Sequence, residues 1–270
     1  MDSNTPTFTL LENVVIIGTD HSQTFSYFRT PIKTSRFAWH ISRADYILSE
    51  TTESISLWQG FSNFESYAER NYPQKVVGIE DKFSGDKRLE LFRGYDFSGD
   101  IFNLYESLKY IQVAIASLMK TGKTFYHHSW EKDRLILGKV IYNSINQTPK
   151  ANKKQKRSMK QFGNTLIKIL GCIDNPSDFD SIRDYLNSYQ ESVRDYEIFF
   201  PESKRLCQEL SGRKVIIVGD DHVEAIRRSL VGEKMERPDN WAEYFEYIPE
   251  KIKLKITKLE KIVSSIIKNK

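Results

Sequence analysis

Lys214–His222 reads KVIIVGDDH, and Asn13–His21 reads NVVIIGTDH, so the same pattern occurs near each end of the chain. In both copies four apolar residues lead into Gly-x-Asp-His. A short, continuous apolar run that is closed by glycine is typical of a strand buried on both faces of a parallel sheet. The two copies therefore predict an α/β fold in which at least two parallel strands lie in the core.

The two histidines follow these strands, where a helix is expected to begin. Because ligand sites in open α/β folds gather at the carboxyl edge of the sheet, we expect His21 and His222 to face the same side. A helix N-terminus favours the neutral imidazole, which lowers its pKa and leaves a ring nitrogen to bind a metal or to accept a proton. A third strand, KVVGIED, ends at Glu80 and brings a carboxylate to the same edge.

Four short elements together resemble the TraB/TIKI superfamily, which includes erythromycin esterase-like and ChaN-like proteins. They are GTDH with His21, GIED with Glu80, GDDH with His222, and Arg194 in ESVRDYEIFF. The resemblance implies a mixed or mostly parallel central sheet flanked by helices and built from two related halves. It also implies metal-dependent cleavage of a peptide or an ester bond.

Two imidazoles and one carboxylate can bind a divalent metal and leave positions open for water, or they can act without a metal as a base and its orienting partner. The expected metal ligands are His21, His222 and Glu80, and the sequence does not distinguish Mn, Co and Zn. The expected catalytic residues are Glu80, His21 and Arg194, the last as a cation that stabilises developing negative charge. The alternative is a non-enzymatic metal- or haem-binding interaction protein with the same fold.

The chain is expected to form one domain over residues 1–270. An aromatic-rich stretch at about 30–60 is interpreted as an insertion, and a lysine cluster at about 149–160 as an exposed basic connection. Residues 249–268 predict a C-terminal amphipathic helix. Its apolar positions fall on one helical face: Ile252, Ile256, Leu259, Val263 and Ile266.

Composition indicates an ordinary globular protein of 270 residues, with 39% hydrophobic and 28% charged residues and a net charge of +4. Two cysteines are too few for a disulfide framework, and no apolar stretch is long enough to span a membrane, so we expect a cytoplasmic protein. A peptide or a small ester is the expected substrate. Nucleic acid is not favoured, because the lysine cluster lacks interleaved aromatic residues, while the C-terminal helix offers a surface for a partner protein.

Overall fold

The computed structural model describes residues 7–19, 36–50, 63–83, 86–120, 130–146 and 153–268. The chain divides into two compact units, residues 1–88 with 190–238 and residues 89–189 with 239–270. The sequence predicted one domain over 1–270. The second unit has a helical core of its own, which the strand motifs do not indicate.

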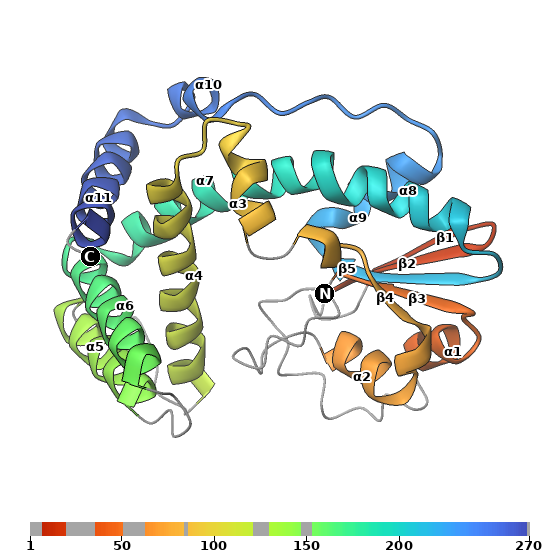
Figure 1. Ribbon diagram of the computed structural model, residues 1–270, viewed down its shortest axis with the longest axis horizontal. Helices are drawn as coiled ribbons and strands as arrows, with labels where there is room; N and C mark the ends of the chain where they lie inside the picture. Colours follow the sequence, from red (N-terminus) through yellow and green to blue (C-terminus); the bar gives the residue numbers. More distant parts are fainter. Residues whose placement is uncertain are drawn as a thin grey trace. The chain divides into compact units, whose positions relative to one another are not determined.

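The first unit holds the sheet (Figure 1). Its elements are β1 (Thr7–Leu11), β2 (Val14–Thr19), α1 (Arg36–Ser42), β3 (Tyr46–Ser49), α2 (Asn63–Asn71), the 3-10 turns η4 (Pro73–Lys75) and η5 (Asp81–Phe83), β4 (Val76–Gly78), the π-helical turn η6 (Asp195–Phe199), α8 (Phe200–Glu209), β5 (Lys214–Gly219) and α9 (Asp220–Leu230).

The five strands lie in the order β1-β2-β5-β3-β4. β2, β5, β3 and β4 are parallel to their neighbours, and β1 pairs with β2 in the antiparallel sense. The two strands of the repeated motif are adjacent, and β5 is buried along its whole length. The prediction of an α/β fold with a mixed, mostly parallel sheet flanked by helices is therefore confirmed.

Helices cover both faces of the sheet, as Figure 1 shows. Side chains of a strand alternate between faces, so neighbouring residues of β5 enter different cores. Val215 and Ile217 pack with Phe37 of α1 and Ala68 of α2. Residues of the opposite face form the second core with η6, α8 and α9: Ile216, Val218, Ile198, Phe199, Leu206 and Ile226.

The interpretation of residues 30–60 as an insertion is corrected by the described part of that stretch. Residues 36–50 form α1 and β3, and β3 lies inside the sheet between β5 and β4. Ile47 and Leu48 are fully buried. This strand has only four residues, so its apolar run is too short to be told from the irregular sequence around it.

The second unit is helical, and helices α3 and α7 cross the boundary between the two units. Its elements are α3 (Asp86–Arg93), α4 (Gly99–Lys120), α5 (Trp130–Asn146), α6 (Lys153–Gly171), α7 (Pro176–Arg194), α10 (Trp241–Glu246) and α11 (Glu250–Lys268). α4, α6 and α11 pack against one another, and α5 packs on α6 and α4. Buried residues from these helices form the core: Leu108, Ile111, Leu137, Leu166, Ile169, Ile256 and Leu259.

Two sequence predictions fall in the second unit. The amphipathic C-terminal helix is present as α11, with Ile252, Ile256, Leu259 and Val263 buried on one side. The basic stretch expected as a connection at about 149–160 is helical from Lys153 onward, and residues 149–152 lie outside the described residues. Exposed lysines are compatible with a helix because their charged ends remain in water while the backbone bonds internally.

Among the helices that the structure describes, none has the length and apolar character needed to cross a membrane.

Candidate functional site

The carboxyl ends of the parallel strands bring charged residues together at one edge of the sheet. Glu50 directly follows β3, Glu80 follows β4 by two residues, and His222 lies in the first turn of α9 after β5. The backbone nitrogen of Glu80 donates to the carbonyl oxygen of Glu50 at 2.9 Å, which extends the pairing of β3 and β4. This bond places the two glutamates on adjacent chains at the same edge.

Two glycines of the motifs are required by close packing at this edge. A Cβ on Gly18 would clash with the carboxylate of Asp220 and the hydroxyl of Thr7 and would lie 2.8 Å from Val223. A Cβ on Gly78 would collide with the carboxylate of Asp81. Both glycines therefore admit neighbouring side chains to the strand ends, which is a structural role.

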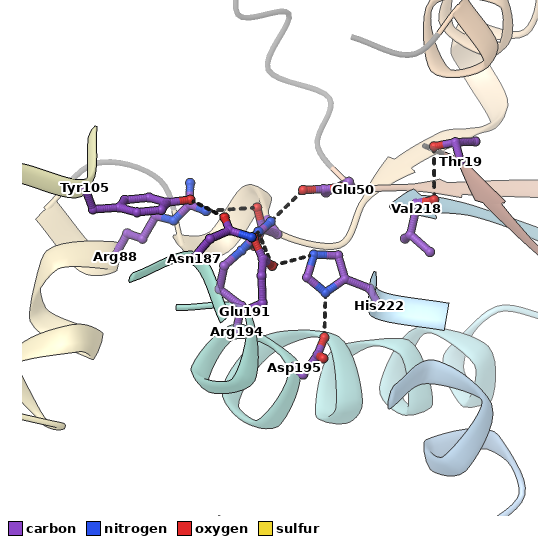
Figure 2. A network of polar contacts seen from close by, with 11 residues as sticks. Thr19, Glu50, Arg88, Tyr105, Asn187, Glu191, Arg194, Asp195, Val218 and His222 are labelled. Carbon is purple, nitrogen blue, oxygen red and sulfur yellow. Dashed lines mark hydrogen bonds and ion pairs between the residues drawn. The ribbon is translucent and has the colours of Figure 1, made fainter. Parts of the chain in front are cut away.

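Arg194, at the end of α7, is bound by three carboxylates (Figure 2). Its Nε donates to Glu80 at 2.8 Å, its Nη2 donates to Glu50 at 2.5 Å, and its Nη1 donates to Glu191 at 2.7 Å. Only 4% of the Arg194 side chain is exposed. Burial opposes the charge, but Glu191, Glu80 and Glu50 outweigh it and hold the pKa of Arg194 well above its usual value.

His222 is held on both sides of its ring (Figure 2). Nδ1 lies 2.6 Å from Asp195 and Nε2 lies 2.9 Å from Glu191, while Phe199 stacks on the ring with 3.8 Å between centroids. Both ring nitrogens face carboxylate oxygens, which accept hydrogen bonds and donate none. Since both nitrogens must then donate, the geometry fits a protonated imidazolium.

The prediction of a neutral histidine with a lowered pKa is wrong for His222. Burial and Arg194 do lower its pKa, but the hydrogen bonds to Asp195 and Glu191 raise it to about 9. The helix N-terminus contributes only a partial charge, whereas two full carboxylates lie within hydrogen-bonding distance of the ring. His222 is therefore a buried cation at neutral pH.

The last turn of α7 and the residue after it supply Glu191, which binds Arg194, and both carboxylates that contact His222, those of Glu191 and Asp195. Glu191, Arg194 and Asp195 have the i, i+3, i+4 spacing that places side chains on one helical face. At Asp195 the α-helix gives way to the π-helical turn η6, and the amide of Phe200 bonds back to the carbonyl of Asp195. Such π-helical turns are frequent at functional sites.

The two acidic partners of His222 differ in protonation behaviour. Burial would raise the pKa of Glu191, but Arg194 and His222 lower it to about 2. Burial raises the pKa of Asp195, and its bond to His222 only partly offsets this. Glu191 is therefore the firmly ionised member of the pair, and Asp195 is the one closer to taking a proton.

We define the residues that converge here as the Arg194 cluster. It contains four carboxylates, two guanidinium groups and one imidazole: Glu50, Glu80, Glu191, Asp195, Arg88, Arg194 and His222.

Three of the four predicted site residues belong to the Arg194 cluster, namely Glu80, Arg194 and His222. His21 lies outside the described residues; Thr19, the last residue of β2, is buried and donates to the carbonyl of Val218 at 3.1 Å. Sequence reasoning did not assign Glu50 or Glu191 to the site. Their sequence signals are weak: YILSE is a short run that ends in glutamate, as VVGIE does, and Glu191 precedes Arg194 by one turn.

The Arg194 cluster, as the structure describes it, does not fit a divalent metal. Both ring nitrogens of His222 are engaged by carboxylates, so neither is free to be a ligand. Glu80 is bound to Arg194, whose positive charge already compensates the carboxylates that a metal would need. Within the described ranges, no group of three histidine, cysteine, aspartate or glutamate residues has the arrangement of a metal site.

Comparison with protein-family models, with curated proteins and with solved structures found no match to this chain. The resemblance to the TraB/TIKI superfamily therefore rests on the four short motifs alone.

The raised pKa of His222 predicts how stability depends on pH. The folded protein binds the proton of His222 more tightly than the unfolded chain does. The contribution of His222 to the free energy of unfolding is therefore complete below the unfolded pKa of 6.5 and is lost as the pH rises through about 9. A shift of this size corresponds to about 3 kcal/mol. We expect the free energy of unfolding, measured by urea denaturation, to fall by up to that amount between pH 6.5 and pH 9.

The variant His222→Gln should show a much smaller fall over this range. His40→Gln is the matched control, because burial and nearby arginines lower the pKa of His40, so that both folded and unfolded forms are neutral above pH 7. An unchanged fall in His222→Gln would contradict the assignment of the charge to this ring.

Proposed function

We propose that the Arg194 cluster is the catalytic centre of a hydrolase that activates water to cleave a peptide bond or a small ester. The observation that carries this proposal is the convergence of four carboxylates, two arginines and one imidazolium from separate segments at the carboxyl edge of a parallel sheet. Ligand sites of open α/β folds gather at that edge. Burying so many charges costs several kcal/mol per ion before pairing, which argues for a use beyond stability.

Glu80 is the proposed general base. Its Oε1 accepts from Arg194 Nε, while its Oε2 lies 3.8 Å from Arg88 Nη2, which is longer than a hydrogen bond. A water bound at Oε2 could therefore transfer a proton to Glu80 and attack the substrate carbonyl. Arg194 keeps the Glu80 carboxylate oriented for this step.

His222 is the proposed positive charge beside the base. As a buried imidazolium with a pKa of about 9, it stabilises the negative charge that develops on the substrate, while Glu80 returns the proton taken from water to the leaving amine or alkoxide. Asp195 and Glu191 orient the ring and stabilise its charge. His21, which lies outside the described residues, is the proposed further residue of the site through the resemblance alone.

The TraB/TIKI resemblance supports this assignment, since its glutamate, its arginine and its second histidine correspond to Glu80, Arg194 and His222. The idea of two related halves is also a proposal. It is supported by the adjacent, parallel placement of β2 and β5, the two strands that carry the Gly-x-Asp-His motif. A metal-dependent form of the reaction would require His222 to release one of its two carboxylates, so we propose the metal-free form.

Chelation with EDTA tests both whether the protein hydrolyses a substrate and whether that hydrolysis requires a metal. Purified protein is incubated with EDTA, desalted into metal-free buffer and assayed against peptide and ester libraries. We expect hydrolysis to persist at the rate of untreated protein. Loss of turnover that Mn, Co or Zn restores would overturn the metal-free mechanism. An absence of hydrolysis from every treated and untreated sample would overturn the hydrolase itself.

The non-enzymatic alternative has one observation in its favour, which is that carboxylates satisfy every nitrogen of the Arg194 guanidinium and of the His222 ring. A cluster saturated in this way can stabilise the first unit without a substrate. The same library assay separates the two functions, because a binding protein would cleave nothing.

A further inference from the structure

A second group of charged and aromatic residues lies at the amino edge of the sheet, where the chain enters β3 and β5. Trp39 of α1 is 49% exposed. The guanidinium carbon of Arg43 lies 4.2 Å from the centroid of the Trp39 ring, and that of Arg213 lies 5.0 Å from it. We call Trp39, Arg43 and Arg213 the Trp39 patch.

Two neighbouring rings extend the Trp39 patch. His40 meets Trp39 edge-on with 4.8 Å between ring centroids, and Phe8 lies 5.6 Å from His40. The guanidinium of Arg36 lies 4.6 Å from the centroid of Phe8. The buried ring of His40 and the half-buried ring of Phe8 therefore lie beside the exposed Trp39 and alternate with flat cations.

Contacts on its buried side fix Arg213. Its Nη2 lies 2.9 Å from Nδ1 of His40, and its backbone nitrogen donates to Asp45 at 2.8 Å. Burial, Arg213 and Arg36 lower the pKa of His40, so the ring is neutral and accepts from Arg213. The guanidinium is thereby held against the indole.

The positive charge of the Trp39 patch is not neutralised within the described residues. There, no carboxylate forms an ion pair with the guanidinium of Arg36, Arg43 or Arg213, whereas Arg205 and Arg227 of α8 and α9 are each bound to glutamates. The amino edge also carries Lys75, which bonds to the carbonyl of Ala44. The acidic residues of the neighbouring turns are Asp45 and Glu12, so cations outnumber anions here.

We propose that the Trp39 patch binds single-stranded nucleic acid. Guanidinium groups match the geometry of phosphate oxygens, and nucleobases stack both on indole rings and on the planes of arginine side chains. The acidic side chains of a peptide would pair with the arginines but carry no ring to stack on the exposed Trp39, whereas every nucleotide carries both a phosphate and a base. This inference does not depend on the proposed hydrolase, because the Trp39 patch lies at the opposite end of the strands.

The expectation against nucleic acid came from the lysine cluster, which has no aromatic residues among its charges. The Trp39 patch has that combination, but it joins residues of α1 to Arg213, more than 170 positions later in the chain. Only the parallel pairing of β3 with β5 brings them together.

The test uses fluorescence anisotropy of the full chain with labelled oligo(U) or oligo(dT) of about twelve nucleotides. We expect binding at about 50 mM salt that weakens steeply as salt rises. Trp39→Ala and Arg43→Gln should each weaken binding about tenfold, and Arg43→Gln should reduce the salt slope by about 0.7. Trp39→Phe should retain most of the affinity, which separates lost stacking from lost folding.

Arg157→Gln on the exposed face of α6 is the matched control and should leave affinity unchanged, as should Glu80→Gln in the Arg194 cluster. An absence of binding at low salt would overturn the proposal. Equal loss of affinity in Arg157→Gln and Arg43→Gln would overturn it as well. So would a polyglutamate peptide of the same charge that binds as tightly as the oligonucleotides, which would indicate an acidic protein partner.

Discussion

Replacing Glu80 with glutamine is expected to lower kcat/KM for peptide or ester hydrolysis by about a thousandfold, the middle of the range for a general base. Glutamine has nearly the same shape, and its amide oxygen can still accept from Arg194 Nε, so the contacts of the neighbouring strand ends are kept. What it cannot do is take a proton from water. The loss should therefore appear in kcat, with little change in KM.

Glu202→Gln provides the matched control. Glu202 is also a buried glutamate of the first unit, and it is bound to Lys82 and Arg205 instead of to Arg194. Turnover of this variant should equal that of the wild type. If Glu80→Gln hydrolysed the substrate as fast as Glu202→Gln does, with both proteins folded, Glu80 would not be the base.

The sequence predicted the parts of the site that follow long apolar runs. β5 is a continuous apolar strand closed by glycine, so its end and the position of His222 follow from the local pattern. Glu80 follows from the same reasoning at β4. Arg194 was placed only through the resemblance, because nothing in the helical spacing of α7 distinguishes Arg194 from Arg183.

The partners of these residues depend on tertiary pairing that short sequences do not encode. Glu50 follows a strand of four residues, and it enters the site because β3 lies between β5 and β4. Glu191 lies on a helix whose other acidic residues face elsewhere. Its role is set by which side of α7 meets the strand ends, and this is a property of the assembled core.

The charge of His222 also depends on tertiary contacts that the sequence does not reveal. The only influence on its pKa that the sequence indicated was the N-terminus of its own helix, which favours a neutral ring. The decisive influences are Asp195 and Glu191, about 30 residues earlier in the chain, at distances of 2.6 and 2.9 Å. Direct hydrogen bonds to two carboxylates exceed the effect of a helix terminus, so the predicted direction of the pKa was reversed.

Replacing Arg194 with methionine is expected to lower the free energy of unfolding by about 3 to 5 kcal/mol at pH 7, the range for removing one partner of a buried ion pair. Methionine fills much of the arginine volume and leaves the carboxylates of Glu50, Glu80 and Glu191 without their shared donor. Urea denaturation measures the loss. Arg205→Met is the matched control, because Arg205 is 37% exposed and binds Glu202 and Glu209 near the surface, where such pairs contribute up to about 1 kcal/mol.

The pH dependence of this loss separates charge from packing. Arg194 helps to hold the pKa of Glu191 low, so without it Glu191 takes up a proton more readily, and the difference in stability between Arg194→Met and the wild type should shrink as the pH is lowered toward 4. A loss caused by poor packing would be the same at each pH. If the loss at pH 7 were no larger than that of Arg205→Met, the three carboxylates would not need Arg194 for their stability. The assignment of Arg194 as the central cation of the Arg194 cluster would then be wrong.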